Sequence, residues 1–325
     1  MPLGKGKAIV PFFLALIYGL LIVSVPWEEL RGVPYPDIEN YEVRYAAVKN
    51  YGLSYFRIDS GVLNYLSAEY LWYFLLASSS LSGIDFDLFV MTCSFSAAFI
   101  SAFWLFGRLH VFWALVLLIN PISIDLFSSQ LRSALAFGLV LFAISFHRKG
   151  LLREGWAYSF FLAACFVHTS MLLIIFVYGI SILLERKKLR STEARLLLSI
   201  GIGVFLAAAY ALLANSILGA IGDRRSLDAN EARSFTYIGF WLFLGMAFCL
   251  RSTVLALTNW RFYYSVLVLI FVGVTELLAV PSFRILAISL PVIFSVFPLL
   301  KVQDARFVIF SVLSYEIILF YYWVN

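Results

Sequence analysis

Apolar residues fill this chain in runs long enough to cross a bilayer, and these runs restrict the fold more than any other feature. The clearest are residues 8–26, 88–106, 196–220, 236–250, 262–280, 285–300 and 307–324. Hydrocarbon offers the backbone no water, so a spanning segment must satisfy its hydrogen bonds as a helix or within a closed barrel. The runs are continuous and lack the alternation of barrel strands, so they predict helices.

Composition supports the same class of protein. Of the 325 residues, 62% are hydrophobic and 13% are charged, and the mean hydropathy is +0.93. We therefore predict an all-α, polytopic integral membrane protein that forms a single transmembrane domain over residues 1–325. The net charge of +5 is explained by cytoplasmic loops and does not indicate nucleic-acid binding. Residues 8–26 are too long for a signal-peptide core and are read as a retained first span.

The centre of the chain is harder to divide into spans. Residues 111–127 and 133–146 are predicted as two short spans, whereas 156–184 are too many for one helix and few for two. One span there would put the basic residues at 148–149 and 186–188 on opposite sides of the membrane. A break at His168 makes a short hairpin and brings both basic clusters to one side, as the positive-inside rule favours.

Segment 66–82 contains Glu69 and a serine-rich end, and no basic residue follows it closely. We read it as an interfacial or partly re-entrant helix, so that 27–87 form a periplasmic loop and this helix. The count is then about 11 spans, some of them short and broken, with the N-terminus inside. If 66–82 crosses instead, the N-terminus moves outside. Arg132, His168 and Arg284 share the outer face under both topologies.

Two arginines on that face are candidates for binding phosphate. Arg132 lies just inside the outer end of its span, where an arginine costs about 2.5–3.5 kcal/mol and needs a partner or a wet cavity. Arg284 begins another span, and a diphosphate requires two positive groups. We expect both, with the neighbouring Gln130, to bind a diphosphate. Snorkelling of Arg132 and interfacial anchoring by Arg284 are the structural alternatives.

His168 coincides with the predicted helix break, and an imidazole can act as a general base near neutral pH. Asp37 and Glu69 are acids on the outer side, and a carboxylate can also accept a proton from an acceptor hydroxyl. These three residues are the candidate catalytic groups. A hydrogen-bonded structural histidine and solvated loop carboxylates are the alternatives.

Two outer loops are candidates for substrate contact. The loop at 27–65 carries Tyr41 among other aromatic residues and is expected to be ordered and to contact sugar rings or headgroups. The loop at 221–235 contains Arg224 and Arg225, which would clamp a pyrophosphate or form surface salt bridges. The sequence has no zinc-ligand spacing, P-loop or nucleophile elbow, so no metal or cofactor is predicted.

The order of several short motifs resembles the EpsG branch of the Wzy-like polysaccharide polymerases. Residues 130–136 (Gln-Leu-Arg-Ser-Ala-Leu-Ala) precede a basic turn and then residues 166–171 (Phe-Val-His-Thr-Ser-Met). An early Asp37–Tyr41 motif, the pair Glu69-Tyr70 and the late Arg284 match further family features. The resemblance covers residues 35–290. Ser133 departs from the glutamine that is usual in the family, which affects that side chain and not Arg132.

The resemblance implies a membrane glycosyltransferase of the bacterial inner membrane, with a fold similar to the GT-C glycosyltransferases. It would join undecaprenyl-diphosphate-linked oligosaccharide repeats into O-antigen or exopolysaccharide on the periplasmic face. The lipid-linked glycan is then the substrate, and a chain-length regulator and a flippase of the same pathway are the expected protein partners. The alternatives are another glycosyltransferase or acyltransferase acting once on lipid-linked glycans, and a polysaccharide transporter or flippase.

Overall fold

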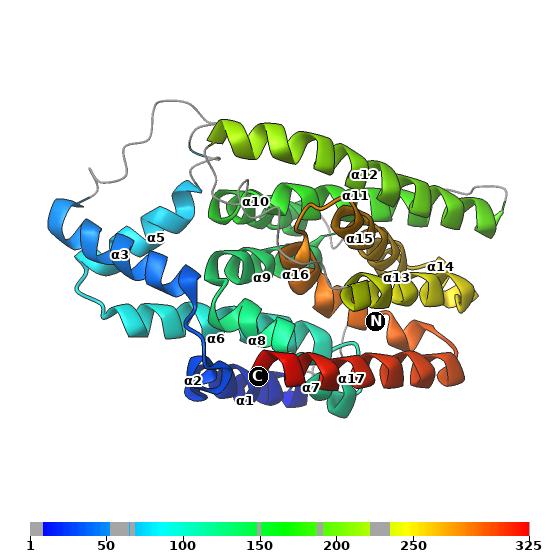
Figure 1. Ribbon diagram of the computed structural model, residues 1–325, viewed down its shortest axis with the longest axis horizontal. Helices are drawn as coiled ribbons and strands as arrows, with labels where there is room; N and C mark the ends of the chain where they lie inside the picture. The colour runs from blue at the N-terminus through cyan, green and yellow to red at the C-terminus, as the bar shows by residue number, and fades with distance from the viewer. Residues whose placement is uncertain are drawn as a thin grey trace. The chain divides into compact units, whose positions relative to one another are not determined.

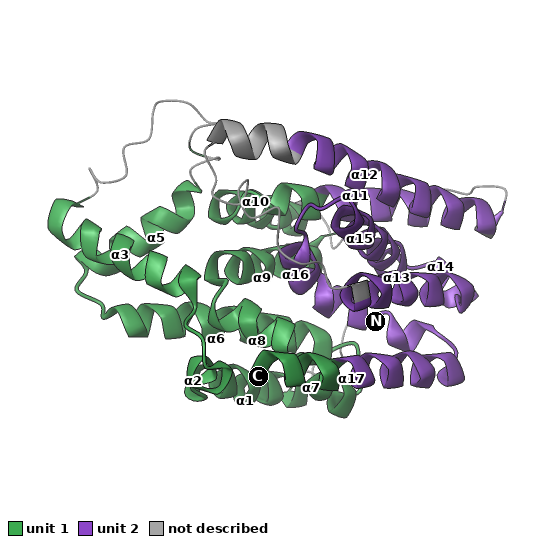
Figure 2. Cartoon of the chain, viewed as in Figure 1, with its two compact units in different colours: residues 1–175, 316–325 green, residues 176–315 purple. Residues whose placement is uncertain are grey.

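The computed structural model describes residues 9–52, 65, 69–147, 151–186, 191–221 and 235–324. Every regular element in this part of the chain is a helix, and none of its residues forms a strand. The prediction of an all-helical fold is therefore confirmed. Contacts between Cα atoms divide the chain into two compact units, residues 1–175 with 316–325 and residues 176–315, each of which is described by itself (Figures 1 and 2).

The first unit holds the N-terminal helices. They are α1 (Ile9–Ser24), α2 (Trp27–Arg31), α3 (Pro36–Tyr51), α5 (Tyr70–Leu81), α6 (Phe86–Phe106), α7 (Val111–Leu118), α8 (Pro121–Ser128), α9 (Leu131–Phe146) and α10 (Leu151–Val167). Helix α6 is central, because it packs against α1, α5, α7, α8 and α9, and α9 in turn packs against α10. Small buried residues let α6 approach its neighbours closely; among them are Ala97, Ala98, Ser101 and Ala102.

The second unit is arranged around α15 (Trp260–Leu277), the most buried long helix of the described chain. Around it pack α12 (Thr192–Ile221), α13 (Phe235–Leu250), α14 (Val254–Leu257) and α16 (Phe283–Phe294). The short 3₁₀ helix η4 (Phe297–Leu299) follows α16. Helix α11 (Met171–Arg186) begins in the first unit and continues in the second, and α17 (Val302–Val324) returns the chain to the first.

Four described helices are long and apolar enough to cross a membrane: α6, α15, α17 and residues 193–213 of α12. Helices α7 and α8 make a fifth candidate as a bent pair, whose axes differ by 70°. Further apolar helices, such as α1 and α9, are shorter. This content of apolar helices supports a membrane protein, while the number of spans and their orientation stay predictions.

The break at His168 is confirmed, because α10 ends at Val167 and α11 begins at Met171. Residues 111–127, predicted as one short span, are broken into α7 and α8, which together still make one candidate span. Asn120 accepts a hydrogen bond from the Ser123 N–H at 2.9 Å, and Pro121 occupies the first position of α8, so a new helix starts there in a new direction. Segment 66–82 contributes α5, whose 12 residues are fewer than a full crossing needs.

Close packing at Gly273 gives a direct test of the second unit. A Cβ atom built on Gly273 would lie 2.2 Å from Leu242 Cδ2, whereas one built on Gly239 meets no atom within 4 Å. Gly273→Ala should therefore lower the free energy of unfolding by about 1–3 kcal/mol, because Leu242 must leave its rotamer. Gly239→Ala should leave it equal or higher, since alanine favours helix. Thermal unfolding in detergent measures both, and equal stability of the two variants would contradict this packing.

Candidate functional site

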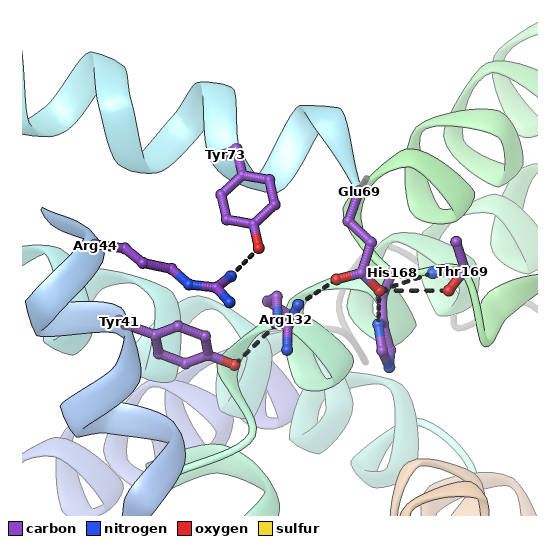
Figure 3. Close-up of polar contacts among 7 residues, drawn as sticks. All are labelled: Tyr41, Arg44, Glu69, Tyr73, Arg132, His168 and Thr169. Carbon is purple, nitrogen blue, oxygen red and sulfur yellow. Dashed lines mark hydrogen bonds and ion pairs between the residues drawn. The ribbon is translucent and has the colours of Figure 1, made fainter. Parts of the chain in front are cut away.

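Four segments that are distant in sequence bring their polar side chains together in the first unit (Figure 3). One is helix α3, and the second is the residue that precedes α5. The third is the first turn of α9, and the fourth is the break between α10 and α11. The labelled side chains are Tyr41, Arg44, Glu69, Tyr73, Arg132, His168 and Thr169, which we call the Glu69 cluster.

Helix α3 presents one polar face to this cluster. Pro36 occupies the first helical position, where its missing N–H removes no helical hydrogen bond. Asp37, Tyr41 and Arg44 then follow at helical spacing on one side. The helix is fixed to its neighbours by Tyr45, whose hydroxyl donates to the Ile84 carbonyl at 2.5 Å and whose carbonyl accepts from the Ser80 hydroxyl at 3.0 Å.

Glu69 has an unusual backbone conformation for its residue type. With φ 54° and ψ 48° it lies in the left-handed region, which a non-glycine residue enters only at a cost of about 1–3 kcal/mol. Its carbonyl accepts from the Trp72 N–H at 3.0 Å and so starts α5. Its carboxylate is only 9% exposed. Such strain at a buried carboxylate is typical of a functional site.

Arg132 binds two partners with its guanidinium group. Its Nη1 forms an ion pair with Glu69 Oε2, and its Nε donates to the Tyr41 hydroxyl at 3.2 Å. The guanidinium carbon also lies 5.5 Å from the centre of the Tyr41 ring, within cation–π distance. Asp37 is near enough for its charge to act on Arg132. The arginine predicted to need a partner has one, and its side chain keeps 21% exposure.

His168 and Thr169 bind the second oxygen of the same carboxylate. Nδ1 of His168 contacts Glu69 Oε1, and the Thr169 N–H donates to that oxygen at 3.2 Å. The backbone N–H of Thr169 is available because the helical pattern stops here, with Met171 N–H bonding back to the His168 carbonyl at 3.0 Å. Within the described residues, Nε2 of His168 has no hydrogen-bond partner. The ring is therefore oriented by Glu69 and presents its other nitrogen to a ligand.

The contacts keep the Glu69 carboxylate ionised. Burial by itself would raise the pKa of this carboxyl above its ordinary 4.5. The hydrogen bond and electrostatic interaction with His168, the charge of Arg132 and the Thr169 N–H outweigh burial and lower the pKa to about 2. Glu69 is thus a permanent anion at working pH, and it is shared by a guanidinium and an imidazole.

Gln130 caps the start of α9 directly before Arg132 and is 8% exposed. Its side-chain oxygen is buried and finds no hydrogen-bond donor among the residues that the structure describes. An unpaired buried acceptor is unfavourable by about 1–3 kcal/mol unless a ligand or water supplies the donor. The predicted role of Gln130 in binding substrate is consistent with this position.

The structure thus gathers five of the predicted residues in one place: Asp37, Tyr41, Glu69, Arg132 and His168. Gln130 adjoins them in the chain. Arg284 belongs to the second unit, near the start of α16, where its guanidinium carbon lies 5.9 Å from the Phe283 ring. Its role in binding diphosphate stays a prediction. Arg224 and Arg225 lie outside the described residues.

Three members of the cluster were not predicted from the sequence. Thr169 is next to His168, but its backbone N–H matters only because the helix stops there. Arg44 donates to the Tyr73 hydroxyl, and its guanidinium carbon lies 5.1 Å from the centre of that ring. The available signal was spacing: Arg44 comes three residues after Tyr41, and Tyr73 four after Glu69. This spacing is informative only once 36–51 and 70–81 are known to be helices.

A cavity of about 880 Å³ lies in the same unit, lined by residues other than those of the Glu69 cluster. Its wall runs from the end of α1 through α2 to Ile38, one turn before Tyr41, and includes Ser128, four residues before Arg132. Aromatic Trp27 and Tyr35 and the acidic Glu28, Glu29 and Asp87 also line it. The Ser128 hydroxyl is buried and makes no hydrogen bond within the described residues. Aromatic rings with carboxylates and hydroxyls suit a hydroxyl-rich ligand.

No group of three or more His, Cys, Asp or Glu side chains able to hold a metal occurs in the part of the chain that the structure describes. The chain matches no protein-family model, no curated protein and no solved structure. What the site can do must therefore be argued from its chemistry. It offers a guanidinium for an anion, and a carboxylate-oriented imidazole for a proton.

Glu69→Gln tests how strongly the cluster holds the first unit together. Glutamine keeps the shape but removes the charge that both Arg132 and His168 contact, so unfolding free energy should fall by about 3 kcal/mol. The matched control is Asp304→Asn, which breaks the half-exposed Arg251–Asp304 pair and should change it by less than about 1 kcal/mol. Denaturant unfolding in detergent compares them. Equal losses of unfolding free energy in the two variants would show that Glu69 stabilises the fold no more than the Arg251–Asp304 pair does.

Acid provides a second test of the same carboxylate. Its pKa is lowered from 4.5 to about 2, so the stability that it contributes is fully present above pH 4.5 and is lost as the pH falls toward 2. The native protein should lose about 3 kcal/mol more than Glu69→Gln over this range. Parallel pH dependences of the two proteins would show that Glu69 is not held as an anion.

Proposed function

We propose that this chain is a membrane glycosyltransferase that polymerises undecaprenyl-diphosphate-linked oligosaccharide repeats into O-antigen or exopolysaccharide. The observation that supports it best is the sharing of the Glu69 carboxylate by Arg132 and His168. A glycosyl transfer from a diphosphate carrier needs a cation for the leaving group and a base for the acceptor. The cluster supplies both within the reach of one carboxylate.

In the proposed reaction, a hydroxyl of the incoming lipid-linked repeat attacks the anomeric carbon of the growing chain. The new C–O bond forms as the bond between that carbon and the carrier's phosphate oxygen breaks. Nε2 of His168 takes the hydroxyl proton, while Glu69 holds the Nδ1–H and stabilises the imidazolium. Undecaprenyl diphosphate leaves with the bonding electron pair, and the proton later passes to solvent.

Arg132 would stabilise the negative charge that develops on the departing phosphate. A guanidinium binds phosphate through two parallel hydrogen bonds, and its partial exposure leaves it accessible. The ion pair with Glu69 positions Arg132 before substrate arrives, so little reorganisation is needed during the reaction. Asp37, one turn from Tyr41 on α3, is close enough to orient the acceptor or to balance the charge.

We assign the sugar part of the substrate to the cavity lined by α2 and the ends of α1 and α3. Trp27 is fixed by donating its indole N–H to the Ile22 carbonyl at 2.9 Å, which leaves its ring to pack on a sugar face. Glu28, Glu29 and Asp87 can accept hydrogen bonds from hydroxyl groups. This use of the cavity agrees with the expected role of the loop at 27–65.

Three further parts of the proposed function rest on the sequence alone. They are about 11 spans, a fold similar to the GT-C glycosyltransferases, and a site on the periplasmic face of the bacterial inner membrane. Binding of the diphosphate by Arg284, and cooperation with a flippase and a chain-length regulator, belong to the same proposal.

Replacing Arg132 with alanine should abolish long polymer. The loss of a charged donor to the leaving group lowers the transfer rate by about 100- to 1000-fold. The measurement is polymer length on a gel, at equal protein level, in cells whose own copy is deleted. The matched control is Arg153→Ala, an exposed arginine of α10 in the same unit, which should leave polymer unchanged.

Normal long chains from the Arg132 variant would contradict the proposal. The same deletion strain separates the alternatives. A polymerase predicts single lipid-linked repeats accumulating on the outer leaflet, a flippase predicts accumulation on the inner leaflet, and a single-addition enzyme predicts polymer that lacks one substituent.

A further inference from the structure

A second arginine faces the same site as Arg132. Arg44 lies on α3 one turn beyond Tyr41, and its guanidinium donates to the Tyr73 hydroxyl. Figure 3 shows it reaching from α3 between Tyr41 and Tyr73, on the side of α3 that also meets Arg132. Arg44 is half-buried, and helices α3 and α5 pack against each other along this face.

The two arginines form two parallel connections between the same pair of segments. Arg132 joins Tyr41 of α3 to Glu69 at the start of α5. Arg44, three residues after Tyr41, contacts Tyr73, four residues after Glu69. The second connection is thus displaced from the first by about one helical turn, roughly 4.5 Å along α3 and roughly 6 Å along α5.

We infer that Arg44 and Arg132 together form a site for the two adjacent phosphoryl groups of a polyprenyl diphosphate, one at each arginine. The inference rests on the proposed function and sharpens it, because it names the side chains that would distinguish a diphosphate from a monophosphate. A monophosphate engages Arg132 alone, whereas a diphosphate spans Arg132 and Arg44. The Tyr41 and Tyr73 hydroxyls, each bound to one arginine, can turn to donate to the same phosphoryl oxygens.

The charges around Arg132 favour a diphosphate site made of two arginines over one made of Arg132 alone. Glu69 already neutralises much of Arg132, and Asp37 adds a further negative charge nearby. A diphosphate would meet little net attraction if Arg132 were the sole cation there. Arg44 adds a second positive charge on the α3 side, which offsets the charge of Asp37, and arginine is suited to the bidentate geometry of phosphate.

The test uses the purified full-length protein in detergent, with geranylgeranyl diphosphate and geranylgeranyl monophosphate as probes. The native protein should bind the diphosphate at least about tenfold more tightly. Arg44→Gln should remove this preference and leave monophosphate affinity nearly unchanged. Arg132→Gln should weaken both ligands, and Arg44→Lys should be intermediate, since it keeps the charge but loses the fork.

The matched control is Lys49→Gln, which removes one positive charge from an exposed position of the same helix. It should keep the diphosphate preference, and thermal unfolding verifies that each variant is folded. The inference is overturned if the Arg44→Gln variant still prefers the diphosphate, or if its affinities for the two probes fall by the same factor. That result would leave the proposed reaction standing. Normal polymer from Arg132→Ala would overturn the reaction, whatever the affinities.

Discussion

The structure of the first unit depends on the carboxylate of Glu69, which contacts both the Arg132 guanidinium and the His168 imidazole. Glu69 receives Arg132 on one oxygen and His168 with Thr169 on the other, and so ties α3, α5, α9 and the α10–α11 break to a single point. A buried anion is tolerable only when it is paired and hydrogen-bonded. Without the charge of Glu69, Arg132 and His168 would lose their common partner, and the segments that carry them would lose their connection to α5.

The arrangement also explains how an apolar protein could carry out polar chemistry. The left-handed backbone of Glu69 aims its carboxylate at both bases before any substrate is present. Its lowered pKa keeps it charged, so that Arg132 and His168 stay oriented across the physiological pH range. An incoming phosphate would exchange with Glu69 at Arg132 without exposing an unpaired charge, because His168 and Thr169 still bind the carboxylate.

Local sequence signals predicted the elements well and the pairings less well. The distribution of basic residues predicted the break at His168. The free-energy cost of an arginine in an apolar run made Arg132 a candidate site residue. The bend at Asn120–Pro121 was missed because hydropathy averages over a capping residue. Arg44 was missed because residues 27–65 were read as a loop, and Tyr73 was missed because nothing in the sequence pairs the helix predicted at 66–82 with that region. The contacts of Glu69 with Arg132 and His168, which are 63 and 99 residues away, are set by the tertiary fold. No periodicity in the sequence predicts them.

The central claim is that the Glu69 cluster transfers a glycan from a diphosphate carrier to an acceptor hydroxyl. The most direct measurement incubates purified protein in liposomes with one lipid-linked repeat unit and counts free undecaprenyl diphosphate against new glycosidic bonds. We expect one molecule of carrier to be released for each bond formed, with products that differ by whole repeats. Carrier released without chain growth, or repeats moved across the bilayer with no new bond, would contradict it.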